Sequence, residues 1–578
     1  MDPQKSFCGP LDVHEPRLGT TDLRACLWRK GNTASHSLFT GTWGYSKKVF
    51  VFADVGQNMW CLDIISIITS IIENLFFTGA VFSWPALQYI LTKQGYFSEL
   101  CFNTNISNSS QTSADYKSLT CVPAEKRFNL VFNLAASLML ISALPFVFIM
   151  SRYGTWVSRT VATTLYTTAF IMLALMTVRT SGLIFAATIF IAVGGMQLFI
   201  TDEQLGHLSP SFESAYVTMI SGLFNTSAAT FVIVKLVYES GTRLETAMWT
   251  LTGLTAFLWL RTFLLMPKAL IPHPLPSNYK LLTMDRFEVA ISKKDIVVPD
   301  ETTPLQGEGV SEDSESDWKS SATSCLFWSN AINFCLTYLC FVCFVGSYVT
   351  WLSDFQTSSQ IAFYISVLGY LGLAGAILSP LPDLVAEMIA YCSKNKIVDK
   401  RKRKLRGLSV TMAVTCLFST LQAVSTVIPN VYAALAFITL FRIFVMGGNA
   451  DFLTTAFPPK HLGILLSITF FVAGVVSLLQ YGLFVLTRIS PEGNNTANYI
   501  IIGLSVITFY HPVIVWIKSR WKWMNKLLKA LLGYLLSCSS LFVSLDLEST
   551  ESTTQMFVFS WKNTPVERKS VLLCLYRK

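Results

Sequence analysis

The sequence predicts an all-α protein that crosses a membrane twelve times, as two bundles of six helices. Hydrophobic residues make up 52% of the 578 residues and charged residues only 14%, with a mean hydropathy of +0.48. Twelve apolar stretches recur, and about 20 helical residues at about 1.5 Å each match a hydrocarbon core of about 30 Å. A long polar segment separates the first six stretches from the last six. A soluble domain of this length would need far more surface charge.

The first stretch, residues 62–91, contains Trp84 and Pro85, and we expect a bend there because proline removes a helix hydrogen bond. The next five stretches are residues 128–150, 157–178, 182–201, 214–238 and 246–266. Together they predict a first six-helix bundle over residues 61–266.

A polar loop between the first two stretches is flanked by Cys101 and Cys121 and contains glycosylation sequons at Asn105 and Asn108. Asn-linked glycosylation implies an extracellular or lumenal face, where a disulfide can persist. The sequence therefore predicts glycans at Asn105 and Asn108. It leaves open whether Cys101 and Cys121 form a disulfide.

Residues 267–323 interrupt the hydrophobic pattern with several prolines and an acidic, serine-rich run, which is typical of a flexible cytosolic linker. Six further stretches follow at residues 325–352, 359–380, 408–428, 431–452, 462–487 and 499–517. They predict a second bundle over residues 324–517. Six spans, a linker and six spans indicate two pseudo-symmetric bundles.

The net charge of +9 is concentrated in short loops and tails, mainly residues 394–406 and 518–529. Such loops stay cytosolic, so we interpret them as a topology signal rather than a nucleic-acid site. The loop before the last stretch then lies outside, and it contains a third sequon at Asn494. We expect a multi-pass plasma-membrane protein with both termini cytosolic. Residues 1–60 are predicted to be a disordered extension without a signal peptide, and 518–578 a basic, atypical tail.

Ionisable side chains inside membrane spans are costly and therefore suggest function. Glu73 and Arg442 lie at similar depth in opposite bundles and could pair across a central cavity. Two interpretations remain open: a structural ion pair, or a group that gates the path or contacts the substrate. Arg261 and Lys235 lie near span ends, where we expect them to reach the headgroups.

Several amide side chains also fall inside spans: Asn74, Gln197, Asn225, Asn449 and Gln480. Amides suit a neutral ligand with ring nitrogens and carbonyls, but they equally hold helices together. Phe77 flanks Glu73 and could stack on a planar ring. We therefore predict Glu73, Arg442, Asn225, Asn449, Gln480 and Phe77 as substrate-binding or gating residues.

Motifs of known catalytic sites are missing from the sequence, including HExxH, GxSxG and the Walker loop. The cysteines other than Cys101 and Cys121, including the pair Cys340 and Cys343, fit buried thiols better than a zinc or redox site. We predict a monomeric non-enzyme that needs no cofactor or metal and interacts with a small-molecule substrate and the lipid bilayer.

Five segments resemble solute carrier family 43: ENLFFTGAVFSWP at 73–85, RTFLLMPKALIPHPLPSNY at 261–279, GGNADFLTTAFPPKHLG at 447–463, VVSLLQYGLFVL at 475–486 and TFYHP at 508–512. The resemblance covers residues 60–518 and implies the major facilitator superfamily fold. Glu73, Asn225, Arg442, Asn449 and Gln480 occupy family motifs. The Trp84-Pro85 pair and the TFYHP segment resemble the nucleobase branch of the family.

The resemblance implies a sodium-independent, equilibrative transporter of adenine, guanine and hypoxanthine that works by alternating access. The alternatives are a facilitator of large neutral amino acids such as leucine and, more distantly, a non-transporting receptor or scaffold. Ser151 stands where the superfamily has an aspartate after span two, and Met388 replaces a basic residue beside Asp383 and Glu387 in the second half. These departures leave the strength of the cytosolic gate open.

Overall fold

The structure is a computed structural model. It describes residues 61–101, 120–208, 213–227, 229–272, 275, 313–392, 400–458, 461–489 and 491–519. Every regular element within these ranges is helical, which confirms the all-α class. The predicted extension 1–60, the sequons at Asn105 and Asn108 and the tail beyond residue 519 lie outside the described residues.

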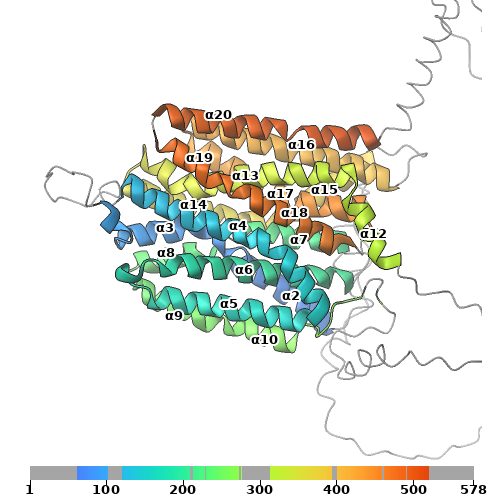
Figure 1. The fold of residues 1–578 in the computed structure, drawn as a ribbon, viewed down its shortest axis with the longest axis horizontal. Coiled ribbons are helices and arrows are strands. Elements are labelled where there is room, and N and C mark those ends of the chain that lie inside the picture. The colour runs from blue at the N-terminus through green and yellow to red at the C-terminus, as the bar shows by residue number, and fades with distance from the viewer. Residues whose placement is uncertain are drawn as a thin grey trace, which may run out of the picture. The chain divides into compact units, whose positions relative to one another are not determined.

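The first half of the chain forms the lower group of helices in Figure 1, coloured blue to green. Its elements are α2 (Cys61–Glu73), η2 (Asn74–Thr78), η3 (Ala80–Ser83), α3 (Trp84–Lys93), η4 (Ser98–Cys101), α4 (Val122–Tyr153), α5 (Thr155–Leu175), η6 (Val178–Thr180), α6 (Leu183–Glu203), η7 (Gln204–Leu208), α7 (Glu213–Thr226), α8 (Ala229–Glu239), α9 (Leu244–Leu254) and α10 (Ala256–Leu264).

The second half forms the upper group, coloured yellow to red. Its elements are α12 (Asp313–Ala322), α13 (Cys325–Ser353), α14 (Ser358–Ile377), α15 (Leu381–Cys392), α16 (Lys400–Val427), α17 (Val431–Ala456), α18 (Leu462–Ser477), α19 (Leu479–Thr487) and α20 (Pro491–Ile507). The two halves meet most extensively where α4 packs on α18 and α7 packs on α17. We call this contact surface the seam.

Nine described helices are long and apolar enough to cross a membrane, and a tenth is added if the bent first span counts as one. The two remaining predicted stretches, residues 157–178 and 246–266, are also largely helical, but they do not pass this test of length and hydropathy. The α5 helix is rich in threonine and carries Arg159, whereas α9 and α10 are two short helices separated at Thr255. The protein is therefore an all-α polytopic membrane protein.

The first span bends at Gly79, so the predicted bend at Trp84 and Pro85 is wrong. Its two parts, Leu62–Thr78 and Ala80–Lys93, meet at 45°. Pro85 instead lies in the first turn of α3, where its missing N–H breaks no helix hydrogen bond. Gly79 packs so tightly on α7 that an added Cβ would overlap the Phe224 carbonyl oxygen, which explains why a glycine is required there.

The break includes the π-helical turn η2, which disturbs the regular hydrogen bonding of the first span. Hydroxyl groups of neighbouring helices bind two carbonyl oxygens of this turn: Thr230 donates to Phe76 and Tyr166 donates to Phe77. These bonds satisfy backbone groups that would be costly to leave unpaired inside a bilayer.

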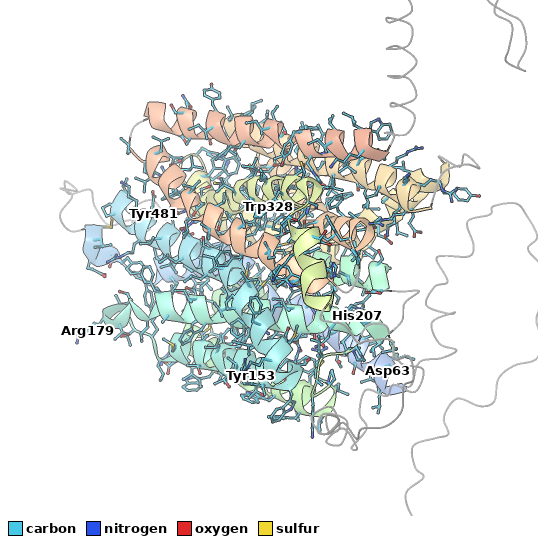
Figure 2. The ribbon with its side chains drawn as sticks, turned by 45° about the vertical axis from the view of Figure 1, so that its right-hand side comes forward. Asp63, Tyr153, Arg179, His207, Trp328 and Tyr481 are labelled. Atoms are coloured by element: carbon cyan, nitrogen blue, oxygen red, sulfur yellow. A yellow bond between two sulfur atoms is a disulfide. The ribbon has the colours of Figure 1, made fainter. Side chains whose placement is uncertain are left out.

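Polar segments define the two ends of the bundle. At one end, a disulfide joins Cys101 to Cys121 and so links η4 to the start of α4. We call this the Cys101 end, and Figure 2 shows Arg179 and Tyr481 on this side. Asp63 and His207 lie on the opposite side, which we call the Lys404 end.

Near the end of the predicted linker, residues 313–322 form the helix α12 at the Lys404 end. This helix packs on α13 and α18. The Ser321 hydroxyl lies 3.1 Å from Nδ1 of His461. The predicted acidic run before residue 313 lies outside the described residues.

Candidate functional site

Aromatic side chains from both halves meet at the seam. Phe82 in η3 meets Phe341 in α13 edge to face, with ring centroids 5.1 Å apart. Phe199 in α6 lies 6.4 Å from Phe470 in α18. We call the buried set the aromatic cluster: Phe82, Phe199, Phe224, Phe334, Tyr338, Phe341, Phe441 and Phe470.

The bend in the first span places one member of this cluster. Phe82 follows Gly79 by three residues and lies in the short 3-10 turn η3, between the two inclined parts of the span. Its ring also meets Phe224 of α7, with centroids 5.8 Å apart. The local break in the helix therefore brings an aromatic ring of the first half against the second half.

Arg442 lies beside the aromatic cluster on α17. Its side chain is 2% exposed, and its guanidinium carbon is 5.8 Å from the centroid of the Phe341 ring. A cation over an aromatic face is attracted by the ring quadrupole, which helps to offset the cost of burial. The predicted pairing of Arg442 with Glu73 is wrong, because Glu73 binds two cations of its own half.

Four buried charges form a compact cluster inside the first half. The Glu73 carboxylate accepts hydrogen bonds from Arg159 at 2.7 Å and from Arg261 at 2.5 Å. Asp202 accepts from the same two residues, at 3.0 Å from Arg159 and 2.7 Å from Arg261. All four side chains are at most 1% exposed. Opposite charges with several hydrogen bonds can tolerate such burial.

This four-charge cluster connects α2, α5, α6 and α10. Arg261 therefore does not reach the headgroups, and that prediction is wrong. The amide of Asn74 donates to Asp202 at 2.7 Å, so Asn74 joins two helices of the first half. Sequence reasoning missed Arg159 and Asp202, because one begins a predicted span and the other lies just beyond one. The available signal was charge, because Arg159 and Asp202 carry charges that could neutralise those of Glu73 and Arg261.

Polar groups close the seam at the Cys101 end. Asn129 on α4 donates to the Gly346 carbonyl at 3.0 Å and accepts from Gln480 at 3.2 Å. Further out, Glu125 and Arg488 form an ion pair at 3.3 Å. Gln480 is thus at the seam, as a gating role requires.

Lys235 also lies at this end, and the prediction that it reaches the headgroups is wrong. Its side chain is 1% exposed, and its ammonium donates to Glu239 at 2.9 Å. It donates equally to Ser366 on α14 of the second half, at 2.9 Å. Lys235 therefore contributes another contact across the seam.

A second polar group closes the seam at the Lys404 end. Ser214 on α7 donates to Asp451 on α17 at 3.1 Å. The Lys404 ammonium donates to Ser214 at 2.8 Å and to Asp383 at 2.9 Å, and lies 2.8 Å from Asp451. Lys404 on α16 supplies the positive charge that position 388 lacks. Contacts therefore hold the two halves together at both ends of the seam.

The remaining predicted residues have different surroundings. Phe77 packs inside the first half, with ring centroids 6.2 Å from Phe257 and 6.0 Å from Tyr166, so it is not at the seam. Asn449 accepts a hydrogen bond from Asn330 at 2.7 Å. The side chain of Asn225 lies outside the described residues, although its backbone belongs to α7. Asn494 is exposed near the start of α20.

Comparison with known proteins gives relatives over most of the chain, although no protein-family model matches it. The chain is 30% identical over 478 residues to equilibrative nucleobase transporter 1 of Bos taurus, covering 78% of this chain and 95% of the relative. It is 25% identical over 513 residues to large neutral amino acids transporter small subunit 3 of Mus musculus, covering 76% and 90%. The Homo sapiens protein of the latter name is 28% identical over 214 residues, covering 36% and 38%.

Proposed function

The chain belongs to solute carrier family 43, a family of membrane transporters, and from this premise we propose that it is an equilibrative transporter of purine nucleobases such as adenine, guanine and hypoxanthine. The Bos taurus and Mus musculus relatives carry the names of transporters and not of enzymes. Transport requires no covalent chemistry, but it requires a site that both halves share and two ends that open in turn.

The aromatic cluster is the observation that carries the proposal. It lies between the halves, and its contacts across the seam are edge-to-face or tilted ring pairs. A purine is planar and can stack on such rings after a small separation of the halves. Arg442 beside Phe341 offers donors to the ring nitrogens or carbonyl oxygen at the edge of the base.

The two closed ends support alternating access. Each end is held by a few hydrogen bonds and ion pairs, so opening one end need not disturb the other. A solute shifts the balance between such states by binding some of them more tightly than others. We place the Lys404 end in the cytosol because of its basic residues, and the Cys101 end outside because of its disulfide and the nearby sequon at Asn494. The plasma membrane is the location that we propose.

Large neutral amino acids are the second candidate solute, since the murine relative is named for their transport. Arg442 could bind the carboxylate of an amino acid. The ammonium group of the amino acid would need an anion, and Glu73 was the candidate from the sequence. Arg159 and Arg261 already bind the Glu73 carboxylate. This arrangement favours a nucleobase.

Competitive uptake separates the two solutes. Purified protein in liposomes, or cells that express the chain, would receive labelled adenine or labelled leucine with the other solute in excess. We expect saturable adenine uptake that unlabelled guanine inhibits and leucine does not. Saturable leucine uptake that adenine leaves unchanged would contradict the proposal.

A matched pair of variants ties uptake to the aromatic cluster. Phe341→Leu removes a ring at the seam, whereas Phe148→Leu changes a ring that is 57% exposed on α4. Stacking of one base on a ring is worth about 1–3 kcal/mol, so adenine affinity should fall about 5–150-fold in the first variant only. Equal affinity in both variants would place the binding site elsewhere.

A further inference from the structure

Two hydrogen bonds of the Asn129 amide cross the seam. Asn129 lies on α4 of the first half and is 1% exposed. Its Nδ2 donates to the Gly346 carbonyl on α13 at 3.0 Å, and its Oδ1 accepts from the Gln480 amide on α19 at 3.2 Å. Both partners belong to the second half, where α4 packs on α13 and α19 (Figure 1). Opening of the Cys101 end therefore breaks both bonds together and leaves a donor and an acceptor on the first half.

This amide lies between the aromatic cluster and the Cys101 end. Tyr338 of the aromatic cluster donates to the Ala136 carbonyl of α4 at 3.3 Å. Asn129 precedes Ala136 by seven residues, which is about 10 Å along the helix axis toward the Cys101 end. On α13, Gly346 likewise lies beyond Tyr338 in the direction of that end. A solute that enters from the Cys101 end therefore meets Asn129 before it reaches the aromatic cluster.

An aromatic ring lies beside the amide. At Gly346 an added Cβ would lie 2.7 Å from the Gln480 amide nitrogen and 2.8 Å from the Phe132 ring. Phe132 follows Asn129 by three residues and shares its face of α4. Trp84 packs against the ring within the first half, with centroids 6.3 Å apart and ring planes at 29°. Withdrawal of Gly346 therefore uncovers an amide and an aromatic ring side by side.

The partners of Asn129 in the closed seam indicate what else it can bind. The Gly346 carbonyl supplies an acceptor and the Gln480 amide supplies a donor. A purine base presents the same pair along one edge: N6–H beside N7 in adenine, and N1–H beside O6 in guanine and hypoxanthine. Asparagine binds such an edge with two hydrogen bonds, and the flat face of the base can stack on an aromatic ring. Asn129 and Phe132 together offer both interactions.

The Gln480 side chain has a further polar atom to offer. Among the residues that the structure describes, its Oε1 is buried with no hydrogen-bond partner. Such an atom loses its hydration without compensation. A base bound to Asn129 has other N–H groups, and one of them can donate to this oxygen as the end begins to close. The second half therefore contributes an acceptor to the same place.

We propose that Asn129, Phe132 and Gln480 form an outer binding site for the purine base, distinct from the aromatic cluster. Closing of the Cys101 end returns the Gly346 carbonyl and the Gln480 amide to Asn129, and these groups displace the base toward the aromatic cluster. No covalent bond forms or breaks. The inference rests on the nucleobase transport proposed above.

A role in closure alone predicts the opposite effect of removing this amide. Loss of a bond that closes the Cys101 end raises the outward-open population, which lowers the external adenine concentration needed for half-maximal uptake. Loss of a bond to the base raises that concentration. Asn133 is the matched control, because it lies one turn further in and its amide donates across the seam to the Ser477 carbonyl at 2.9 Å.

The first experiment measures initial uptake of labelled adenine against its external concentration, corrected for protein at the cell surface. Asn129→Leu removes two neutral hydrogen bonds, so the half-maximal concentration should rise about 5–150-fold. Asn133→Leu should leave it unchanged or lower it. Asn129→Ala should match Asn129→Leu, which removes dependence on the folding of one variant. Unchanged or lower values in both Asn129 variants would overturn the inference.

A second experiment detects the bound base directly. Ser137 lies two turns inward of Asn129, is buried, and has its hydroxyl 2.8 Å from that of Ser477 across the seam. In Ser137→Cys, an impermeant maleimide added outside reaches the new thiol by passing Asn129, and the protein with serine at this position gives the background. External adenine should slow the reaction. With Asn129→Leu added, the same protection should require about 5–150-fold more adenine.

The two experiments separate the outer site from the proposed function. Protection that depends on Asn129 in cells that take up no adenine would support the site and refute adenine transport. Adenine uptake together with protection that Asn129→Leu leaves unchanged would overturn the inference and leave the proposed function standing. Absence of any protection by adenine would also overturn the outer site.

Discussion

The Arg261 guanidinium donates to the Glu73 carboxylate at 2.5 Å, although the two residues are 188 positions apart in the chain. This bond joins the first span to the sixth and closes the first half upon itself. Arg159 and Asp202 complete the cluster from the third and fourth spans. The cluster lies wholly within one half, so it can stay intact while the halves move.

Replacing Arg261 should destabilise the protein strongly. Arg261→Met leaves two buried carboxylates with one guanidinium, and breaking a buried pair in this way costs about 3–5 kcal/mol. Thermal unfolding in detergent measures the loss. Arg179→Met, at an exposed arginine, should stay within about 0.5 kcal/mol of the wild type. Equal melting temperatures for the two variants would show that the cluster contributes little to stability.

Replacing Arg442 should impair solute uptake rather than folding. A hydrogen bond from a charged group is worth about 1.5–3 kcal/mol, so Arg442→Ala should weaken the apparent affinity for adenine about 10–150-fold. Arg442→Lys should not restore uptake, since lysine lacks the planar fork of donors. Concentration-dependent uptake, corrected for protein at the cell surface, measures both. Normal uptake by Arg442→Ala would remove this residue from the site.

Removing Lys404 should open the seam at its own end. Lys404→Met leaves Asp383 and Asp451 close together without their shared cation. Each decrease of about 1.4 kcal/mol in the stability of the closed state raises the ratio of open to closed protein about tenfold. A cysteine introduced by Thr218→Cys should then react faster with a water-soluble maleimide. Lys319→Met, at an exposed lysine of α12, serves as the control and should leave the reaction rate unchanged.

Two glycines test the Cys101 end. At Gly346 an added Cβ would lie 2.7 Å from the Gln480 amide nitrogen and 2.8 Å from the Phe132 ring, whereas at Gly482 it would meet nothing within 4 Å. Gly346→Val should therefore hold this end apart and slow transport, and Gly482→Val should not. Initial uptake rates give the comparison. Similar rates for the two variants would mean that closure at Asn129 is not needed.

Glycosylation at Asn494 tests the sidedness of the protein. Asn494 is exposed near the start of α20, close in sequence to Arg488 at the Cys101 end. If this end lies outside, Asn494→Gln should remove one glycan, and glycosidase treatment should shift the wild-type band more than the variant band. In a second variant, Asn494→Cys, labelling of the new thiol by an impermeant maleimide only after cell lysis would reverse the proposed topology.

Hydropathy was sufficient to predict the long apolar helices, because burial in lipid demands long apolar segments whatever their neighbours are, but it did not predict the polar helix α12. It could not predict which faces meet. Glu73 and Arg442 have matching depth along their spans, but depth does not fix rotation, and the carboxylate faces its own half. The bend at Gly79 escaped for a related reason: it depends on the close approach of the Phe224 carbonyl, which no local pattern reveals.

The candidate site was predictable only in part. Gln480 and Arg442 were identified because polar groups are rare in spans, and both lie at the seam. The aromatic cluster was not identified, since phenylalanines are common in every span and nothing in the sequence distinguishes Phe82, at the seam, from Phe77, inside the first half. Lys404 was assigned to a loop, whereas it lies in the first turns of α16 and faces two aspartates.

The two carboxylates and two guanidinium groups of the first half sum to zero charge. Membrane voltage therefore exerts no net force on that cluster, however the half that contains it tilts. Arg442 is not part of this neutral cluster, and it lies near the middle of α17 in the other half. Electrical sensitivity of flux should accordingly originate at Arg442 and at the charged ends of the seam.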